Sequence, residues 1–290
     1  MHVNPKYVII TPIRDEEAFI ELTLKSVTNQ TVLPTEWIIV NDGSTDLTGH
    51  IVDKYVDQYS WIHAVHRENR GFRSAGGGVI EAFYAGYTAL KEREWNYIVK
   101  LDGDLSFDAD YFEKIFNYFQ QSQDLGVGGG SIYNLVNGAQ VMEKHPLFHV
   151  RGATKIYKRE CWDAIGGLLV APGWDTLDEV KANMLGWKSR TFQDLKVIHH
   201  RYTGAADGQW RSYVKYGRAN YISGYHPLFI VLKCLRRVLH KPILLGAIGI
   251  VYGYVSAHLN GVPQVDDRAL IAYLRRQQLN KILMRETIWE

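Results

Sequence analysis

Apolar and polar residues alternate in two different rhythms over the first hundred positions of the chain. Short apolar runs rich in β-branched and aromatic residues stand at 7–10, 37–40, 61–65 and 97–101. Between these runs, apolar residues recur every three or four positions, which is typical of amphipathic helices. Strands that alternate with helices in this way predict an α/β fold, a mostly parallel sheet with helices on both faces.

The α/β pattern continues beyond residue 104 but becomes less regular. Helical spacing predicts further helices at 111–119 and 176–185, and apolar runs predict strands at 126–133, 155–157 and 191–198. From residue 226 the composition changes, because apolar residues mix with lysine and arginine and a nearly uncharged stretch follows. We therefore predict an α/β domain over 1–225 and a helical C-terminal appendage over 226–290.

Two interpretations of the appendage stay open. Residues 242–259 are almost entirely apolar, at the lower limit of length for a membrane span. The preceding residues include Lys233, Arg236 and Arg237, and basic residues beside apolar ones favour anionic lipid surfaces. Residues 228–260 could thus contact a membrane peripherally. Alternatively, the stretch is a helix packed on the α/β domain, with its glycines allowing close approach.

Composition narrows the class of protein. The chain has 290 residues, of which 46% are apolar, enough for a substantial core. A formal charge of +2 gives no basic field for nucleic acid, so we expect no nucleic-acid partner. Two cysteines far apart in sequence indicate a reducing compartment. The polar N-terminus does not look like a secretory signal, so we expect a cytoplasmic protein, with the inner face of the cell membrane as the alternative.

The triplet Asp102-Gly103-Asp104 directly follows the apolar run 97–101. In open α/β sheets, ligands bind beyond the carboxyl ends of the strands. Carboxylates at that edge can hold a hard divalent cation such as Mg²⁺ or Mn²⁺, which screens phosphate oxygens. Alternatively, the triplet only forms a turn, because Asp and Gly are both common in turns.

Polar residues follow the first two strands as well. Asp42 comes directly after the second strand, where a carboxylate can accept hydrogen bonds from a base or ribose. The first strand ends in a similar segment that contains Thr11, Pro12, Arg14 and Glu16. Because neighbouring parallel strands end at the same edge, these segments could line one nucleotide pocket.

A glycine-rich segment at 71–78 opens the third predicted helix. Free N–H groups at a helix N-terminus can approach phosphate, and Arg73 could pair with a diphosphate. The glycines follow the third strand rather than the first, which argues against a dinucleotide-binding dehydrogenase.

The later part of the domain supplies a second group of candidates. Three carboxylates stand at the start of the helix at 176–185, and Asp175 is best placed to point into a cleft, with Asp178 as the alternative. Trp174 could stack on a sugar ring. His199 and His200 end the last strand, and since adjacent strand residues face opposite ways, at most one should reach a metal.

Taken together, these motifs resemble the family 2 glycosyltransferases of the GT-A fold, a Rossmann-like fold for nucleotide-diphosphate sugars. The likeness covers about 7–202. The motifs that carry it are Pro12 with Asp15-Glu16-Glu17, the loop 41–46, Asn69 with Gly71, the Asp-x-Asp triplet, Gly166-Gly167, and Gly186-Trp187.

The resemblance implies metal-assisted, inverting transfer of a sugar from a nucleotide-diphosphate donor to an acceptor hydroxyl. By the family pattern, Pro12, Glu16 and Asp42 fall at the nucleotide and Asp102 at the donor. Asp104, with His199 or His200, falls at the Mn²⁺ or Mg²⁺ ion. Asp175 falls at the catalytic base, eleven residues before Gly186 as in similar enzymes.

The acceptor implied is a glycan or a lipid-linked sugar. The chain lacks the Gln-x-x-Arg-Trp pattern of processive synthases, so we expect one sugar per encounter. Two alternatives are a sugar-nucleotide pyrophosphorylase and a sugar-nucleotide-binding protein without transfer activity. The segment 11–17 lacks the glycine-rich loop of the former.

Overall fold

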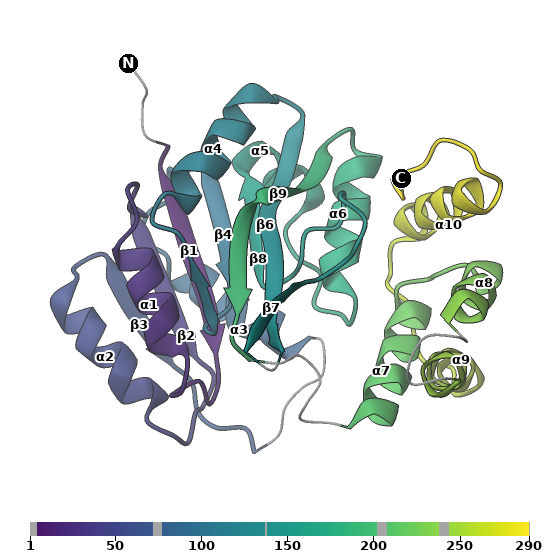
Figure 1. Ribbon diagram of the computed structural model, residues 1–290, viewed down its shortest axis with the longest axis horizontal. Helices are drawn as coiled ribbons and strands as arrows, with labels where there is room; N and C mark the ends of the chain where they lie inside the picture. Colours follow the sequence, from purple (N-terminus) through teal and green to yellow (C-terminus); the bar gives the residue numbers. More distant parts are fainter. Residues whose placement is uncertain (1–4, 72–76, 137, 202–207, 238–243, 290) are drawn as a thin grey trace.

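The computed structural model describes residues 5–71, 77–136, 138–201, 208–237 and 244–289. In this part of the chain, nine strands form one sheet with the order β3-β2-β1-β4-β8-β6-β9-β5, and β7 pairs with β6. Helices cover both faces of the sheet (Figure 1). The strands are β1 (Tyr7–Ile13), β2 (Glu36–Asn41), β3 (Ile62–His66), β4 (Tyr97–Leu101), β5 (Leu105–Phe107), β6 (Leu125–Val136), β7 (Ala139–Met142), β8 (Thr154–Lys158) and β9 (Lys188–His199).

The first four strands pair in parallel, as the sequence predicts. Strand β1 lies between β2 and β4, so the chain moves outward through β2 and β3 and returns to the other side of β1. The reversal makes the carboxyl ends of β1 and β4 a topological switch point, where α/β sheets commonly bind ligands. The remaining strands are mixed, because β8 pairs antiparallel with both β4 and β6.

Alternating side chains of β1 show how the strands join two apolar layers. Tyr7 and Ile9 face one hydrophobic cluster, which α1, α2 and α4 cover, whereas Val8 and Ile10 face the other, beneath α3, α5 and α6. All four are fully buried. These helices are α1 (Ile20–Thr28), α2 (Thr48–Gln58), α3 (Gly78–Ala89), α4 (Tyr111–Gln121), α5 (Arg159–Ile165) and α6 (Trp174–Met184).

The C-terminal helices form a separate group that lies beside α6 at the right of Figure 1. They share a third hydrophobic cluster with Leu177 and Val180 of α6, so the group is packed on the α/β domain. The group consists of α7 (Gln209–Ile222), α8 (Pro227–Arg237), α9 (Leu245–Leu259) and α10 (Arg268–Ile282).

Close approach of α7 and α9 depends on glycine. A Cβ atom on Gly217 would lie 2.0 Å from the carbonyl oxygen of Ile250, and one on Gly253 would lie 2.1 Å from that of Val214. On the face of α9 that contains Gly253, glycine therefore allows close helix packing, as the second interpretation of the 242–259 stretch expects. Among the described helices, none combines the length and apolar character needed to cross a membrane.

Helix α7 lies within the C-terminal group although the sequence assigned its residues to the α/β domain. The division at 225/226 stays a prediction. The packing of α7 against α9 argues for placing the boundary before Gln209.

Candidate active site

The carboxyl ends of β1, β2, β3 and β4 bring four sequence segments to one edge of the sheet. Asp42 follows β2, Arg67 follows β3, and Asp102 follows β4. The parallel pairing fixes this arrangement, since Ile13 is in register with Asn41, and Asn41 with His66. The edge predicted to bind a nucleotide donor is therefore assembled from these segments.

Asp42 is held by two arginines. Its carboxylate oxygens lie 2.7 Å from Nη1 of Arg67 and 2.9 Å from Nη2 of Arg70, and Arg70 also pairs with Glu81 at 2.5 Å. The side chain of Asp42 is mostly buried, so these charges offset much of its desolvation cost. The arrangement presents a carboxylate flanked by strong hydrogen-bond donors.

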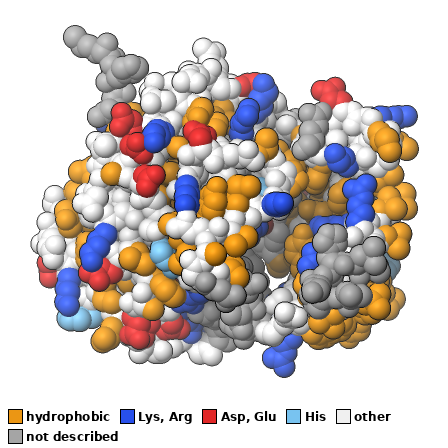
Figure 2. All heavy atoms as spheres, in the orientation of Figure 1, with side chains coloured by type: hydrophobic (Ala, Val, Ile, Leu, Met, Phe, Trp, Pro, Cys, Tyr) orange, Lys and Arg blue, Asp and Glu red, His pale blue; other side chains and the backbone are white. Residues whose placement is uncertain are grey.

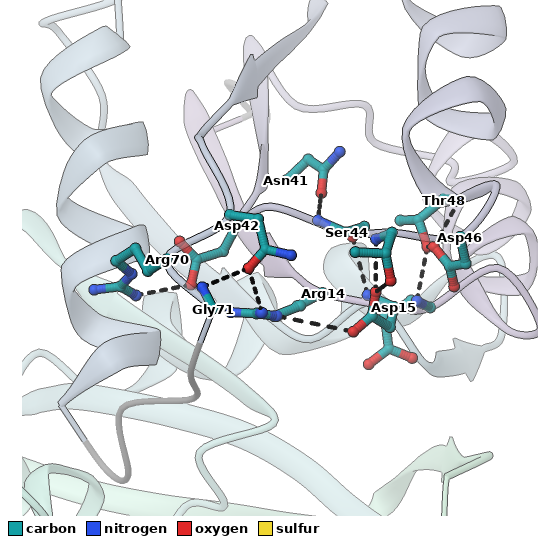
Figure 3. A network of polar contacts seen from close by, with 12 residues as sticks. Arg14, Asp15, Asn41, Asp42, Ser44, Asp46, Thr48, Arg70 and Gly71 are labelled. Carbon is teal, nitrogen blue, oxygen red and sulfur yellow. Dashed lines mark hydrogen bonds and ion pairs between the residues drawn. The ribbon is translucent and has the colours of Figure 1, made fainter.

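The segment after β1 is joined to the loop after β2 (Figure 3). Asp15 has a positive φ of 53°, and its backbone N–H donates to Ser44 Oγ at 2.9 Å. Its carboxylate accepts from the Thr45 N–H, also at 2.9 Å. Arg14 donates to the side chain of Asn69 at 2.8 Å, so this segment also reaches the loop after β3.

Glu16 also follows β1 at this edge of the sheet. Its carboxylate pairs with Arg201 at 2.7 Å, and Arg201 also donates to the carbonyl of Asp15. Arg201 follows the last strand of the domain, so the pair connects the first and last strands of the site.

Asp104 and His199 meet at the end of β4. The Nε2 atom of His199 lies 3.1 Å from Oδ2 of Asp104, and both side chains are largely buried. Burial opposes charge on His199, but the bond to Asp104 outweighs this and raises the pKa of the imidazole. His200 faces the other way and lies 2.8 Å from Ser106 Oγ. Of these two histidines, His199 is thus the one whose side chain contacts the Asp104 carboxylate, and the expectation that at most one of them reaches a metal stays a prediction.

The residues present fit a divalent cation. Oδ1 of Asp104 is buried and has no hydrogen-bond partner, and carboxylate oxygens are ligands that Mn²⁺ and Mg²⁺ prefer; the imidazole of His199 lies beside this carboxylate. Among the described residues, no group of three or more His, Cys, Asp or Glu side chains is arranged so that it could hold a metal ion by itself. The protein would then hold the ion through few ligands and leave positions for donor phosphates, as Mg²⁺ sites commonly do.

Two buried lysines stand in register on β4 and β8. Lys100 pairs with Asp102 and donates to the carbonyl of Gly152 at 2.6 Å. Lys155 lies 2.8 Å from both carboxylate oxygens of Asp178. The two ammonium groups each lie 5.5 Å from the centre of the ring of Trp174, the first residue of α6.

Asp175 and Asp178 differ in exposure. Asp178 is 2% exposed, pairs with Lys155, and accepts a hydrogen bond from the Tyr157 hydroxyl. Burial raises its pKa to about 6. Asp175, the second residue of α6, is half-buried and lines a cavity. The geometry thus gives Asp175, and not Asp178, access to a bound molecule.

That cavity joins the two halves of the predicted site. Its volume is about 220 Å³, and Asp102, His199 and Asp175 all line it. The cavity is also lined by Arg151 and Glu143, which pair with each other at 2.6 Å. Donor-side and base-side residues that are far apart in the sequence therefore face one space.

Some predicted residues do not point into this space. Thr11 is fully buried and its hydroxyl accepts from Trp37 Nε1 at 2.8 Å, so we leave its side chain out of the site. Pro12 is buried within β1, and Gly103 allows close packing, since a Cβ there would lie 2.4 Å from Ile13. Trp174 does line the cavity, but it is only 7% exposed and packs in the core, with little surface left for stacking on a sugar. Arg73 lies outside the described residues.

Sequence reasoning missed the cations that hold these carboxylates. Arg67 and Arg70 follow β3, and the rule that identified Asp42 would also have found them, because all lie at the same strand edge. Lys155 had no comparable signal. It lies inside a predicted strand, and its partner Asp178 stands 23 residues later, on α6.

Comparison with known proteins decides the family. The family described as Glycosyl transferase family 2 matches residues 8–168, more than half of the chain. The chain belongs to glycosyl transferase family 2. Its resemblance to these enzymes in motif order is thereby confirmed, and the pyrophosphorylase alternative is set aside.

Two bacterial relatives of this family 2 chain illustrate the similarity. Glycosyltransferase GlyA of Streptococcus pneumoniae is 29% identical over 139 residues, 48% of this chain and 18% of the relative. The uncharacterized glycosyltransferase EpsJ of Bacillus subtilis is 32% identical over 126 residues, 43% of this chain and 34% of the relative. The chain thus spans about a third or less of the length of these relatives.

Solved structures confirm the GT-A fold. TarS of S. aureus has a TM-score of 0.54 at 18% identity, over 89% of this chain and 72% of that one. The mannosyltransferase PcManGT from Pyrobaculum calidifontis, in complex with GDP-Man and Mn²⁺, has a TM-score of 0.56 at 16% identity. The match covers 98% of this chain and 84% of PcManGT.

Proposed function

We propose that this protein transfers a single sugar from a nucleotide-diphosphate donor to a hydroxyl of a glycan or lipid-linked acceptor, with inversion. One observation carries the proposal, namely that Asp102, His199 and Asp175 line the same cavity. Family membership supports the chemistry, and the separation of donor-side and base-side groups supports a single displacement.

The donor would lie along the edge formed by β1, β2 and β4. Asp42, held by Arg67 and Arg70, would contact the base or ribose, near Arg14 and Glu16. The backbone of Pro12 would line the same pocket. Asp102 would contact the sugar or ribose, with Lys100 holding its carboxylate in place.

Asp104 and His199 would hold the divalent cation. When bound, the ion would offset negative charge on the donor diphosphate. The buried and unpartnered Oδ1 of Asp104 supports this assignment. His200 is a weaker candidate because it faces Ser106.

Asp175 would act as the general base. Its carboxylate would accept the proton of the acceptor hydroxyl as that oxygen bonds to the anomeric carbon and the bond to the diphosphate breaks. Asp178 would instead hold Lys155 and α6 in place. The exposure of Asp175 and the burial of Asp178 support this division of roles.

Transfer can be tested by incubating the protein with UDP- and GDP-sugars, Mn²⁺ and candidate acceptors. We expect Asp175→Asn to lower transfer about 10²–10⁴-fold, because a base that removes the acceptor proton contributes on that scale. Donor binding, followed by thermal shift, should persist in this variant.

Asp178→Asn serves as the comparison. We expect it to lower stability more than the rate per folded molecule. Full transfer in Asp175→Asn with loss in Asp178→Asn would reverse the assignment of the base. Donor binding without diphosphate release under any condition would favour a binding protein without transfer activity.

The C-terminal helices would associate with the inner face of the cell membrane. Residues 228–260 supply the contact, through exposed apolar side chains on α8 and α9. Leu235 is 61% exposed and Ile248 is 54% exposed. On this basis the chain combines an α/β catalytic unit with a helical unit that faces the membrane.

A further inference from the structure

A large basic cleft lies between the α/β domain and the C-terminal helices. Its volume is about 970 Å³. Figure 2 shows the hollow to the right of centre, with Lys and Arg side chains beside it. The basic residues that line it are Lys144, Arg151, Lys233, Arg236, Arg237 and Lys281.

The positive charge of this cleft is largely unbalanced. Glu143, the carboxylate among its described lining residues, is paired with Arg151. Lys233 and Arg237 donate instead to the hydroxyls of Tyr216 and Tyr213, at 2.7 and 3.0 Å. Neither Arg236 nor Lys281 forms an ion pair with a described carboxylate within 4.0 Å. Like charges gathered without counter-charges favour an anionic ligand.

The cleft continues toward the base. Glu143 and Arg151 line both the cleft and the smaller cavity that contains Asp175. Thr176, the next residue along α6, also lines the cleft. A ligand held in the cleft would therefore reach Asp175 with one end.

The other end of the cleft meets an apolar groove on α8 and α9. Leu235 lines both. The groove has a volume of about 650 Å³ and is formed by side chains such as Ile248, Val251 and Val255. Since the glycine face of α9 packs on α7, these exposed side chains form its opposite face.

We infer that the acceptor is a lipid whose headgroup carries a phosphate, bound with the phosphate in the basic cleft and the hydrocarbon chain in the α8–α9 groove. The inference rests on the proposed function and names its acceptor class. The basic side chains would bind the phosphate, and the apolar groove would bind the hydrocarbon chain. Glu143 and Arg151, which line both the cleft and the cavity of Asp175, would orient the headgroup toward Asp175.

The test is binding to phosphatidylcholine vesicles with and without a minor fraction of phosphatidic acid, measured by flotation of the full chain. We expect binding only with phosphatidic acid. Arg236→Gln with Lys281→Gln should weaken it roughly 30-fold, because each basic residue at an anionic bilayer contributes about fivefold in affinity. Lys54→Gln with Lys91→Gln removes the same charge outside the cleft and should leave binding unchanged.

Ile248→Gln with Val251→Gln tests the groove. Both side chains are exposed, so the fold should tolerate the change, and we expect weaker vesicle binding. Equal losses in both charge variants would show nonspecific attraction and overturn the inference. So would absence of vesicle binding, or full binding by the groove variant.

Donor binding is measured separately on the wild-type protein, as a thermal shift with UDP or GDP and Mn²⁺. Vesicle binding that fails while the donor shift is present would refute only the lipid acceptor. A donor shift that is absent would refute the proposed function.

Discussion

The residues at the centre of the molecule are charged although they are buried. Lys155 lies between Asp178 and Glu179, at 2.8 Å from each carboxylate, and all three are at most 2% exposed. Burial alone would lower the pKa of Lys155, but the two carboxylates outweigh it and raise the pKa. His149 pairs with Glu179 at 2.9 Å and completes the cluster. The net charge of this buried cluster changes with pH, because burial raises the pKa of Asp178 to about 6.

The raised pKa of Asp178 gives a prediction for stability. Between the ordinary carboxyl pKa and about 6, the folded protein binds a proton at Asp178 that the unfolded chain does not. Stability from this group is therefore lost as pH rises through that window. As pH rises through this window, the free energy of unfolding of the wild type should fall by up to about 3 kcal/mol relative to that of Asp178→Asn, which has no carboxyl group at this position.

Urea unfolding of both proteins between pH 4 and pH 7 measures the difference, with about 1.4 kcal/mol expected per unit of pKa shift. Glu113→Gln, which changes a carboxylate at the surface and retains Asp178, serves as the control, and its stability should follow that of the wild type across this pH range. A constant difference between wild type and Asp178→Asn would contradict the raised pKa.

Sequence reasoning at this scale succeeds where strand geometry decides the outcome. The alternation of strand side chains separates His199 from His200, and the strand ends locate Asp42 and Asp102. It fails for Lys155, because the partner Asp178 comes from a distant segment, and it also did not single out Lys100, whose partner Asp102 is a near neighbour in the sequence. A lysine inside an apolar run has no signal that says which carboxylate will neutralise it.

At the scale of elements, the packing of α7 on α9 allows a prediction that opposes helix propensity. Alanine favours a helix over glycine by about 1 kcal/mol, so Gly217→Ala would stabilise an isolated α7. In the folded protein the new methyl group would lie 2.0 Å from the Ile250 carbonyl oxygen. We expect a net loss of about 1–3 kcal/mol in the free energy of unfolding, typical of overpacking.

Thermal or urea unfolding measures this loss, with Arg211→Ala on the exposed side of α7 as the control. The control should stay within about 0.5 kcal/mol of the wild type. Higher stability in Gly217→Ala would contradict the close approach of the two helices.

Most elements with a clear apolar pattern were predicted well, including the short strands β4 and β8, whereas the 14-residue helix α7 was not predicted. The strand 97–101 matches β4, and the predicted strand 7–10 lies within β1. The strands β5 and β7 and the helix α5 were missed, because each is too short to show a period. Helix α6 begins at Trp174, two residues earlier than predicted, which places Asp175 in its first turn.

At the scale of the whole molecule, the sequence supports two parts but does not say how they meet. The third hydrophobic cluster joins α6 to the C-terminal helices, and the basic cleft lies along the same junction. Contacts between segments so far apart in the chain have no local pattern. The sequence therefore could not predict that α6, which carries Asp175, packs against the C-terminal helices.

We propose above that Asp104 and His199 hold a divalent cation together with the donor diphosphate. Calorimetric titration of UDP and GDP, with and without Mn²⁺, tests it most directly. We predict that the wild type binds one of the nucleotides only with Mn²⁺. Asp104→Asn and His199→Ala should each weaken that binding at least about tenfold, while His200→Ala retains it. Binding that is independent of Mn²⁺, or unchanged in Asp104→Asn, would contradict the assignment of these two residues to the cation.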